Sequence, residues 1–145
     1  MTSPFVAHRD KVLGHYSTAA WLRRLVLAMW NGNAYPVGLS QLTNLDDSHA
    51  KAVLEMLSSY RQNGENDATF MALAEECRAR LEEEAAAAQR ADEFEAWLRQ
   101  VRSELRTVGL SRDLADDRYD WFEGKFNAGL TPGDAAREAA RANLV

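Results

Sequence analysis

Residues 65–108 contain neither glycine nor proline, and Gly64 and Gly109 close this 44-residue stretch on either side. Glycine and proline are the residues least compatible with a helix interior, so nothing local interrupts a helix here. Asp67 is a suitable N-cap because its short side chain can accept a hydrogen bond from a free amide of the first turn. The stretch therefore predicts one long helix over about residues 67–108.

Two apolar stripes run along this stretch, and each alternates spacings of four and three residues. In strict heptads the first stripe would continue at Arg102 rather than Val101, so the stripes are out of phase. The pattern fits one helix that changes packing partner at alanines 85–88, or two helices broken near residues 89–92. High helix propensity favours the single helix. The stripes are Phe70, Ala74, Cys77 and Leu81, then Phe94, Leu98, Val101, Leu105 and Val108.

The formal net charge of −5 falls entirely on this stretch. Residues 65–108 carry 11 acidic and 6 basic side chains, whereas the rest of the chain carries 11 of each. In one interpretation the helix is solvated and its charges form i,i+4 ion pairs. In the other it is an acidic surface that docks on a protein partner with a basic surface. For the second interpretation, the candidate partner-binding carboxylates are Glu75, Glu76, Glu82, Glu83 and Glu84.

The charge is also polarised along the helix. Residues 65–95 hold ten acidic side chains against three arginines, and a basic run of Arg99, Arg102, Arg106 and Arg112 follows. This run suggests an alternative, a dimeric DNA-binding or regulatory protein. The acidic balance of the whole chain argues against direct nucleic-acid binding. A third interpretation is a helical oligomerisation module, such as a homodimer.

A chain of 145 residues is long enough to bury one core. We expect an all-α protein in three segments that form one compact unit: an N-terminal helical bundle (1–64), the long acidic helix (65–108) and a C-terminal helical pair (109–145). No apolar run is long enough for a membrane span. The single cysteine, Cys77, excludes an internal disulfide and fits a reducing cytoplasm.

Two clear helices are predicted in the N-terminal bundle. The first begins at Ser17, is apolar over most of its circumference, and ends at residues 31–32, so it belongs at the centre of a bundle. The second begins at Asp46 or Asp47 and ends at residues 63–64. A helix-turn-helix is disfavoured, because a recognition helix opening with two carboxylates would meet DNA phosphates.

The C-terminal segment adds acidic and aromatic candidates for partner binding. Asp116, Asp120 and Glu123 share a helix face at i, i+4 and i+7. No glycine-rich loop of oxygen ligands surrounds them, so a solvated or arginine-paired face is expected rather than a metal site. Trp97 and Trp121 are the candidate aromatic anchors if they are exposed.

The chain lacks the motifs that would indicate catalysis. It has no glycine-rich phosphate loop, no paired histidines of a zinc protease and no nucleophile elbow. We therefore expect no enzymatic activity, no catalytic residues, no cofactor and no metal.

Residues 19–32, which read AAWLRRLVLAMWNG, precede a loop, a short turn at Leu39 to Leu42 and a helix to Tyr60. This arrangement, over roughly residues 17–64, resembles an uncharacterised helical family carried on plasmids and phages of proteobacteria. The resemblance implies a mobile-element accessory gene and assigns no functional residues.

Taken together, these features predict a non-enzymatic protein-interaction protein. The leading hypothesis is an inhibitor of a host defence complex, similar in style to anti-CRISPR proteins. Its carboxylates would occlude a basic surface that otherwise holds nucleic acid, while aromatic side chains anchor the contact.

Overall fold

A computed structural model describes residues 2–144. These residues form helices joined by turns and loops, with no strand among them, which confirms the all-α fold. In chain order the elements are α1 (Pro4–Ala7), α2 (Arg9–Val12), α3 (Ser17–Trp30), η1 (Leu39–Asn44), α4 (Asp47–Asn63), η2 (Gly64–Asn66), α5 (Ala68–Thr107), α6 (Leu114–Asp117), α7 (Tyr119–Asn127) and α8 (Pro132–Arg141).

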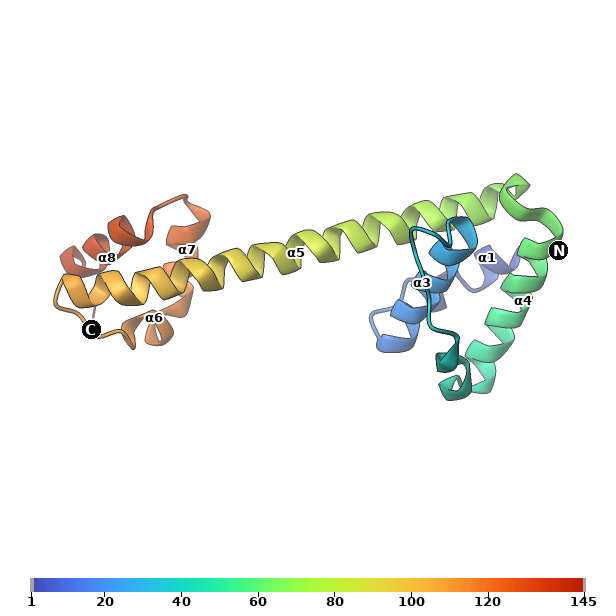
Figure 1. The fold of residues 1–145 in the computed structure, drawn as a ribbon, viewed down its shortest axis with the longest axis horizontal. Helices are drawn as coiled ribbons and strands as arrows, with labels where there is room; N and C mark the ends of the chain where they lie inside the picture. Colours follow the sequence, from blue (N-terminus) through green and yellow to red (C-terminus); the bar gives the residue numbers. More distant parts are fainter. Residues whose placement is uncertain (1, 145) are drawn as a thin grey trace. The chain divides into compact units, whose positions relative to one another are not determined.

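Helix α5 runs unbroken for 40 residues, so the single long helix is confirmed over the broken alternative (Figure 1). Asp67 precedes it and accepts a hydrogen bond from the backbone N–H of Thr69 at 2.9 Å. The helix ends where Gly109 adopts a left-handed φ of 83°, and the N–H of Leu110 donates to the carbonyl of Leu105 at 2.8 Å. Glycine is favoured at this position because it has no Cβ to clash in that conformation.

The described chain divides into two compact units, and the division falls inside α5 between Glu83 and Glu84. We call residues up to 83 the N-terminal unit and residues from 84 the C-terminal unit. This differs from the expected division at residues 64 and 108 into segments of one compact unit. The reason is the phase change in α5, because Phe70, Ala74 and Cys77 of its first stripe enter one hydrophobic cluster and its second stripe enters another. Leu81, the last residue of the first stripe, is exposed.

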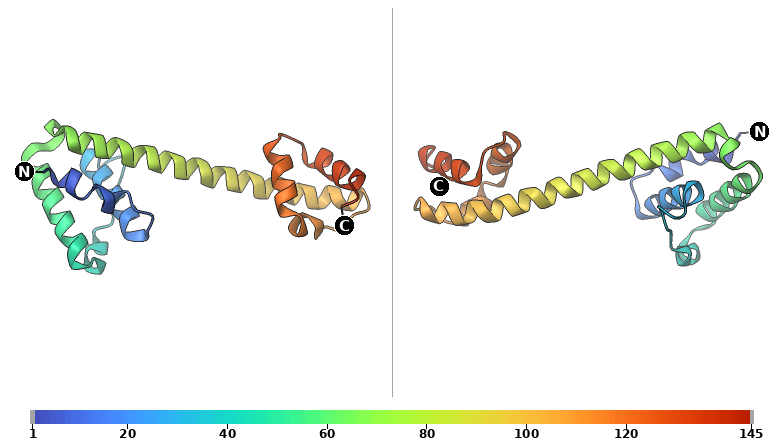
Figure 2. Two further views of the ribbon diagram at one scale, coloured as in Figure 1. Left: turned by 180° about the vertical axis from the view of Figure 1, so that it is seen from behind. Right: turned by 45° about the horizontal axis from the view of Figure 1, so that its top comes forward.

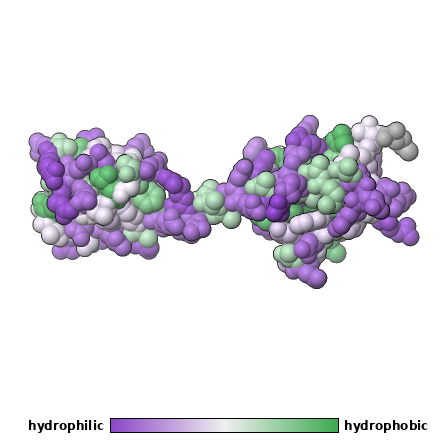
Figure 3. Space-filling view, turned by 90° about the horizontal axis from the view of Figure 1, so that it is seen from above, coloured by the Kyte–Doolittle hydropathy of each residue, from purple (hydrophilic) through white to green (hydrophobic). Residues whose placement is uncertain are grey.

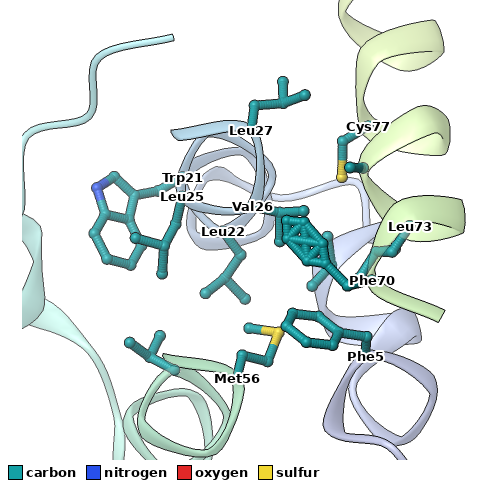
Figure 4. Packing of buried hydrophobic residues seen from close by; sticks show 13 residues of the cluster. Phe5, Trp21, Leu22, Leu25, Val26, Leu27, Met56, Phe70, Leu73 and Cys77 are labelled. Atoms are coloured by element: carbon teal, nitrogen blue, oxygen red, sulfur yellow. The ribbon is translucent and has the colours of Figure 1, made fainter. Parts of the chain in front are cut away.

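The core of the N-terminal unit is built around α3 (Figure 4). Leu22 and Val26 are fully buried. The rings of Phe5 and Phe70 meet edge to face, with centroids 5.0 Å apart. Trp21 lies on another side of α3, where its indole N–H donates to the carbonyl of Gly38 at 2.8 Å. The α3 sequence, apolar over most of its circumference, is therefore central as expected, and the buried indole has the partner it requires.

The core of the C-terminal unit forms where α6, α7 and α8 pack around the last turns of α5 (Figure 2). Phe122 of α7 is fully buried against this stripe. Helix α8 contributes small side chains, which allow its backbone to approach closely. Thr131 caps its start, with Thr131 Oγ1 accepting from the N–H of Asp134 at 3.1 Å. The buried residues that α5 and α8 contribute to this core are Phe94, Trp97, Leu98, Val101, Leu105, Ala135, Ala136 and Ala139.

Cys77 is fully buried in the N-terminal core, as predicted, and burial raises the pKa of its thiol to about 12. Because the thiolate is the reactive form, we expect no reaction of the native protein with a disulfide reagent such as DTNB at pH 8. In guanidinium chloride one thiol per chain should react at once. Rapid labelling of the folded protein would contradict this placement.

Candidate functional site

Residues 81–93 of α5 are exposed at every position, and we call them the acidic segment. They carry five carboxylates against a single guanidinium, and four consecutive alanines lie among them. With no apolar face to bury, the segment depends on the high helix propensity of alanine, glutamate and arginine to remain helical. Figure 3 shows hydrophilic side chains predominating on the face in view, with apolar ones in limited patches.

The five carboxylates predicted on α5 fall into two groups. Glu75 forms an ion pair with Arg78, and Glu76 binds Arg9 of α2 through both carboxylate oxygens. Both arginine partners lie in the N-terminal unit, so these two carboxylates are engaged in ion pairs within that unit. The other three lie in the acidic segment and are exposed: Glu82, Glu83 and Glu84.

Within that second group the carboxylates are differently engaged. An oxygen of Glu82 lies 3.7 Å from a nitrogen of Arg78, which already pairs with Glu75. Glu83 forms no ion pair with any residue between 2 and 144. Negative charge in this part of α5 is thus only partly compensated within the chain.

The three C-terminal carboxylates do not share one helix face, contrary to expectation. Asp116 belongs to α6, whereas Asp120 and Glu123 belong to α7. Arg118 separates the helices with φ −121° and ψ 40°, which interrupts the helical phase. Asp116 instead accepts a hydrogen bond from Arg102 at 2.7 Å. Asp120 and Glu123 remain exposed on α7.

Trp97 is buried, so it does not meet the condition of exposure under which it was a candidate anchor. Its indole N–H donates to the carbonyl of Leu130 at 2.9 Å, and its ring lies 5.5 Å from that of Phe126. Position 97 flanks the second α5 stripe, and Phe126 of α7 packs against its ring. Trp121 is half-buried, with its ring 4.9 Å from the ammonium of Lys125.

Three side chains of the N-terminal unit are linked by hydrogen bonds that were not predicted from the sequence. Tyr16 Oη lies 2.8 Å from His49 Nε2, and His49 Nδ1 lies 2.9 Å from Asp46 Oδ1. Asp46 also caps α4, and the hydrogen bonds from His49 lower the pKa of its carboxyl. The sequence spacing Asp46-x-x-His49 could have indicated the contact between these two side chains at the start of α4. Tyr16 lies 33 residues away from His49, and only the fold brings it there.

The loop that presents Tyr16 is held by two arginines. Arg23, which is buried, donates to the carbonyls of Val12 at 2.9 Å and Gly14 at 2.7 Å. Arg80 donates to the carbonyl of Leu13 at 3.2 Å. A Cβ on Gly14 would lie 2.3 Å from the Tyr16 ring, so no other residue fits there without moving the tyrosine. The two arginines fasten this loop to α3 and α5, and the Tyr16–His49 hydrogen bond joins it to the first turn of α4.

A cavity of about 450 Å³ is lined by residues such as Thr18, Arg24 and Gln41, and neither Tyr16 nor His49 lines it. A larger open groove of about 910 Å³ lies between residues 2–4 and α4. Among residues 2–144, no group of three or more His, Cys, Asp or Glu side chains is placed to hold a metal ion.

No helix within residues 2–144 combines the length and apolar character needed to cross a membrane.

Comparisons with known proteins identify the family to which the chain belongs. No curated protein and no solved structure matches the sequence. A family of unknown function (DUF7673) matches residues 10–89, which include Tyr16, His49 and the first part of the acidic segment. The match spans more than half of the chain and contains the region of the expected resemblance to an uncharacterised family. The chain belongs to this family of unknown function, DUF7673.

Proposed function

We propose that this protein is a non-enzymatic interaction protein that docks on a basic protein surface through the acidic segment of α5. The observation that carries the proposal is that every residue from 81 to 93 is exposed, and that these residues hold five carboxylates and one guanidinium. None of these residues belongs to either hydrophobic core. Complementary charge of this kind steers association and selects partners of the opposite sign.

The specific form of the proposal is occlusion of a nucleic-acid-binding surface. Three consecutive glutamates, Glu82 to Glu84, occupy only about 4.5 Å of the helix axis, or one carboxylate per about 1.5 Å. DNA carries one negative charge per about 1.7 Å of its axis, so this short stretch approaches the same linear charge density. A mobile-element inhibitor of a host defence complex would act in this way, by occupying the site of the nucleic acid.

The proposal predicts that a triple charge reversal, Glu82→Lys, Glu83→Lys and Glu84→Lys, weakens partner binding by on the order of a hundredfold. Circular dichroism and the unfolding temperature should stay close to those of the native protein, because the three side chains are exposed. The matched control reverses Asp10, Glu65 and Asp113, which are also exposed. If both triple variants bound the partner with equal affinity, the acidic segment would not be part of the binding surface.

The partner itself is sought by affinity capture with the tagged full chain from a bacterial lysate, with and without nuclease. A stoichiometric partner that survives nuclease treatment, and that releases its nucleic acid when this protein binds, supports occlusion. A partner that retains its nucleic acid when bound contradicts it. Recovery of only the protein itself favours an oligomerisation module.

One observation favours the DNA-binding alternative. Arg99, Arg106 and Arg112 are exposed and form no ion pair within the described residues, whereas Arg102 is engaged by Asp116. A DNA-binding protein that uses these three arginines would retard duplex DNA with a steep dependence on salt concentration. Absence of retardation at low salt excludes it.

A further inference from the structure

The C-terminal unit contains a small pocket between α5 and α7 that no sequence motif signals. Its volume is about 280 Å³. Three aromatic rings form its walls: the ring of Phe94 lies 5.1 Å from that of Tyr119, edge to face, and 5.1 Å from that of Phe126. Arg90, Glu123 and Asn127 complete the lining, and we call this site the aromatic pocket. Its size suits a single side chain rather than a larger small-molecule ligand.

One carboxylate, that of Glu123, lines the aromatic pocket together with Tyr119. Burial raises the pKa of the Tyr119 hydroxyl, and the nearby carboxylates of Glu95, Glu123 and Asp120 raise it further. Each of the three carboxylates would also stabilise a positive charge placed beside the phenol. The faces of the aromatic rings, which carry partial negative charge, act in the same direction.

The pocket already accommodates one guanidinium. Arg90 places its guanidinium carbon 5.6 Å from the centroid of the Phe126 ring, and it also donates a hydrogen bond to Asn127 Oδ1. This cation lies at the Phe126 side, whereas Glu123 and Tyr119 line the pocket without an ion pair among the described residues. The Glu123 carboxylate and the Arg90 guanidinium are the two charged groups that line the pocket, and the carboxylates of Glu95 and Asp120, which also act on Tyr119, add negative charge around it.

We propose that the aromatic pocket binds one arginine or lysine side chain of a protein partner. The pocket begins within the acidic segment, which contributes Arg90, so the anchor and the charged surface are continuous along α5. The acidic segment would attract a basic surface, and the pocket would hold one of its cations against aromatic rings and the Glu123 carboxylate. Interface energy is commonly concentrated in such a pocket. This inference deepens the proposed function and rests on it for the identity of the partner class.

The test uses small probes and therefore does not depend on finding the partner. The full chain is titrated with N-acetyl-arginine methylamide, and the aromatic proton resonances of Phe94, Tyr119 and Phe126 are followed by NMR. The citrulline analogue, which has almost the same shape and no charge, is the matched probe. We expect saturable shifts of these three rings with the arginine probe at millimolar concentration, and none with citrulline.

Two variants sharpen the result. Glu123→Gln should weaken arginine binding by about threefold or more, while Asp113→Asn, which removes an exposed carboxylate from outside the pocket, should leave it unchanged. Arg90→Gln should strengthen binding by about threefold, because it removes the competing cation. A site for an anion would respond to Arg90→Gln in the opposite direction.

Equal shifts with arginine and citrulline, no saturable shifts at the three rings, or weaker binding to Arg90→Gln would each overturn the inference. The charge-reversal experiment on Glu82 to Glu84 fails or succeeds independently. Suppose that the pocket binds arginine but that charge reversal of Glu82 to Glu84 leaves partner affinity unchanged. The proposed docking surface would then be wrong, and the inference about the pocket would still hold.

Discussion

Replacing Phe122 by alanine is expected to unfold the C-terminal unit while the N-terminal unit keeps its structure. Phe122 is fully buried, and its ring lies 4.9 Å from that of Trp121. Substitutions of this type cost about 3–5 kcal/mol. A unit of this size has a free energy of unfolding of roughly 3–9 kcal/mol, at about 0.05–0.15 kcal/mol per residue. The loss is therefore comparable to the whole stability of the unit.

The four tryptophans report on the two units separately. Trp21 and Trp30 belong to the N-terminal unit, and Trp97 and Trp121 belong to the C-terminal unit. In Phe122→Ala, the indole N–H resonances of the second pair should collapse to unfolded positions while those of the first pair stay. The reciprocal variant, Phe70→Ala, should affect the first pair only. Loss of all four resonances in both variants would show that the units do not fold independently.

Replacing Arg23 by methionine is expected to lower the stability of the N-terminal unit by about 3 kcal/mol, since hydrogen bonds to a charged group each contribute about 1.5–3 kcal/mol. Methionine keeps much of the side-chain length but donates nothing to the carbonyls of Val12 and Gly14, which Arg23 now holds. The loop that carries Tyr16 should loosen as a result, and the Tyr16–His49 hydrogen bond should be lost with it.

The neighbouring arginine provides the control for this prediction. Arg24 follows Arg23 on α3 but is exposed, so Arg24→Met changes charge and length equally without uncovering a carbonyl. Thermal unfolding followed through the Trp21 and Trp30 indole resonances should separate the two variants clearly. A similar unfolding temperature for both would mean that the carbonyls of residues 12–14 are satisfied equally well by water.

The sequence predicts the helices of this protein better than it predicts its units. The unbroken α5 follows from the absence of glycine and proline, and the central place of α3 follows from its wide apolar surface. The phase change between the two α5 stripes indicates a change of packing partner. It does not reveal that the partners on either side form separate cores, because periodicity records which face is apolar and not what covers it.

The candidate sites were less accessible to sequence reasoning. Exposure of Glu82 to Glu84 follows from the weak apolar pattern around the alanines. Burial of Trp97 depends on α7, whose rings close over a flank of the α5 stripe. The break at Arg118, which separates Asp116 from Asp120, involves no glycine or proline and leaves no local signal. Contacts between residues far apart in sequence, such as Tyr16 with His49, are set by packing alone.

The acidic segment also has an evolutionary consequence. The family match ends at residue 89, inside this exposed stretch and close to the point at which the units divide. Residues 81–93 contribute no side chain to either core. Recombination within this stretch of the gene would therefore break no core packing, and new C-terminal units could be appended to the same N-terminal unit. A change confined to the C-terminal unit would thus leave the packing of the N-terminal unit intact.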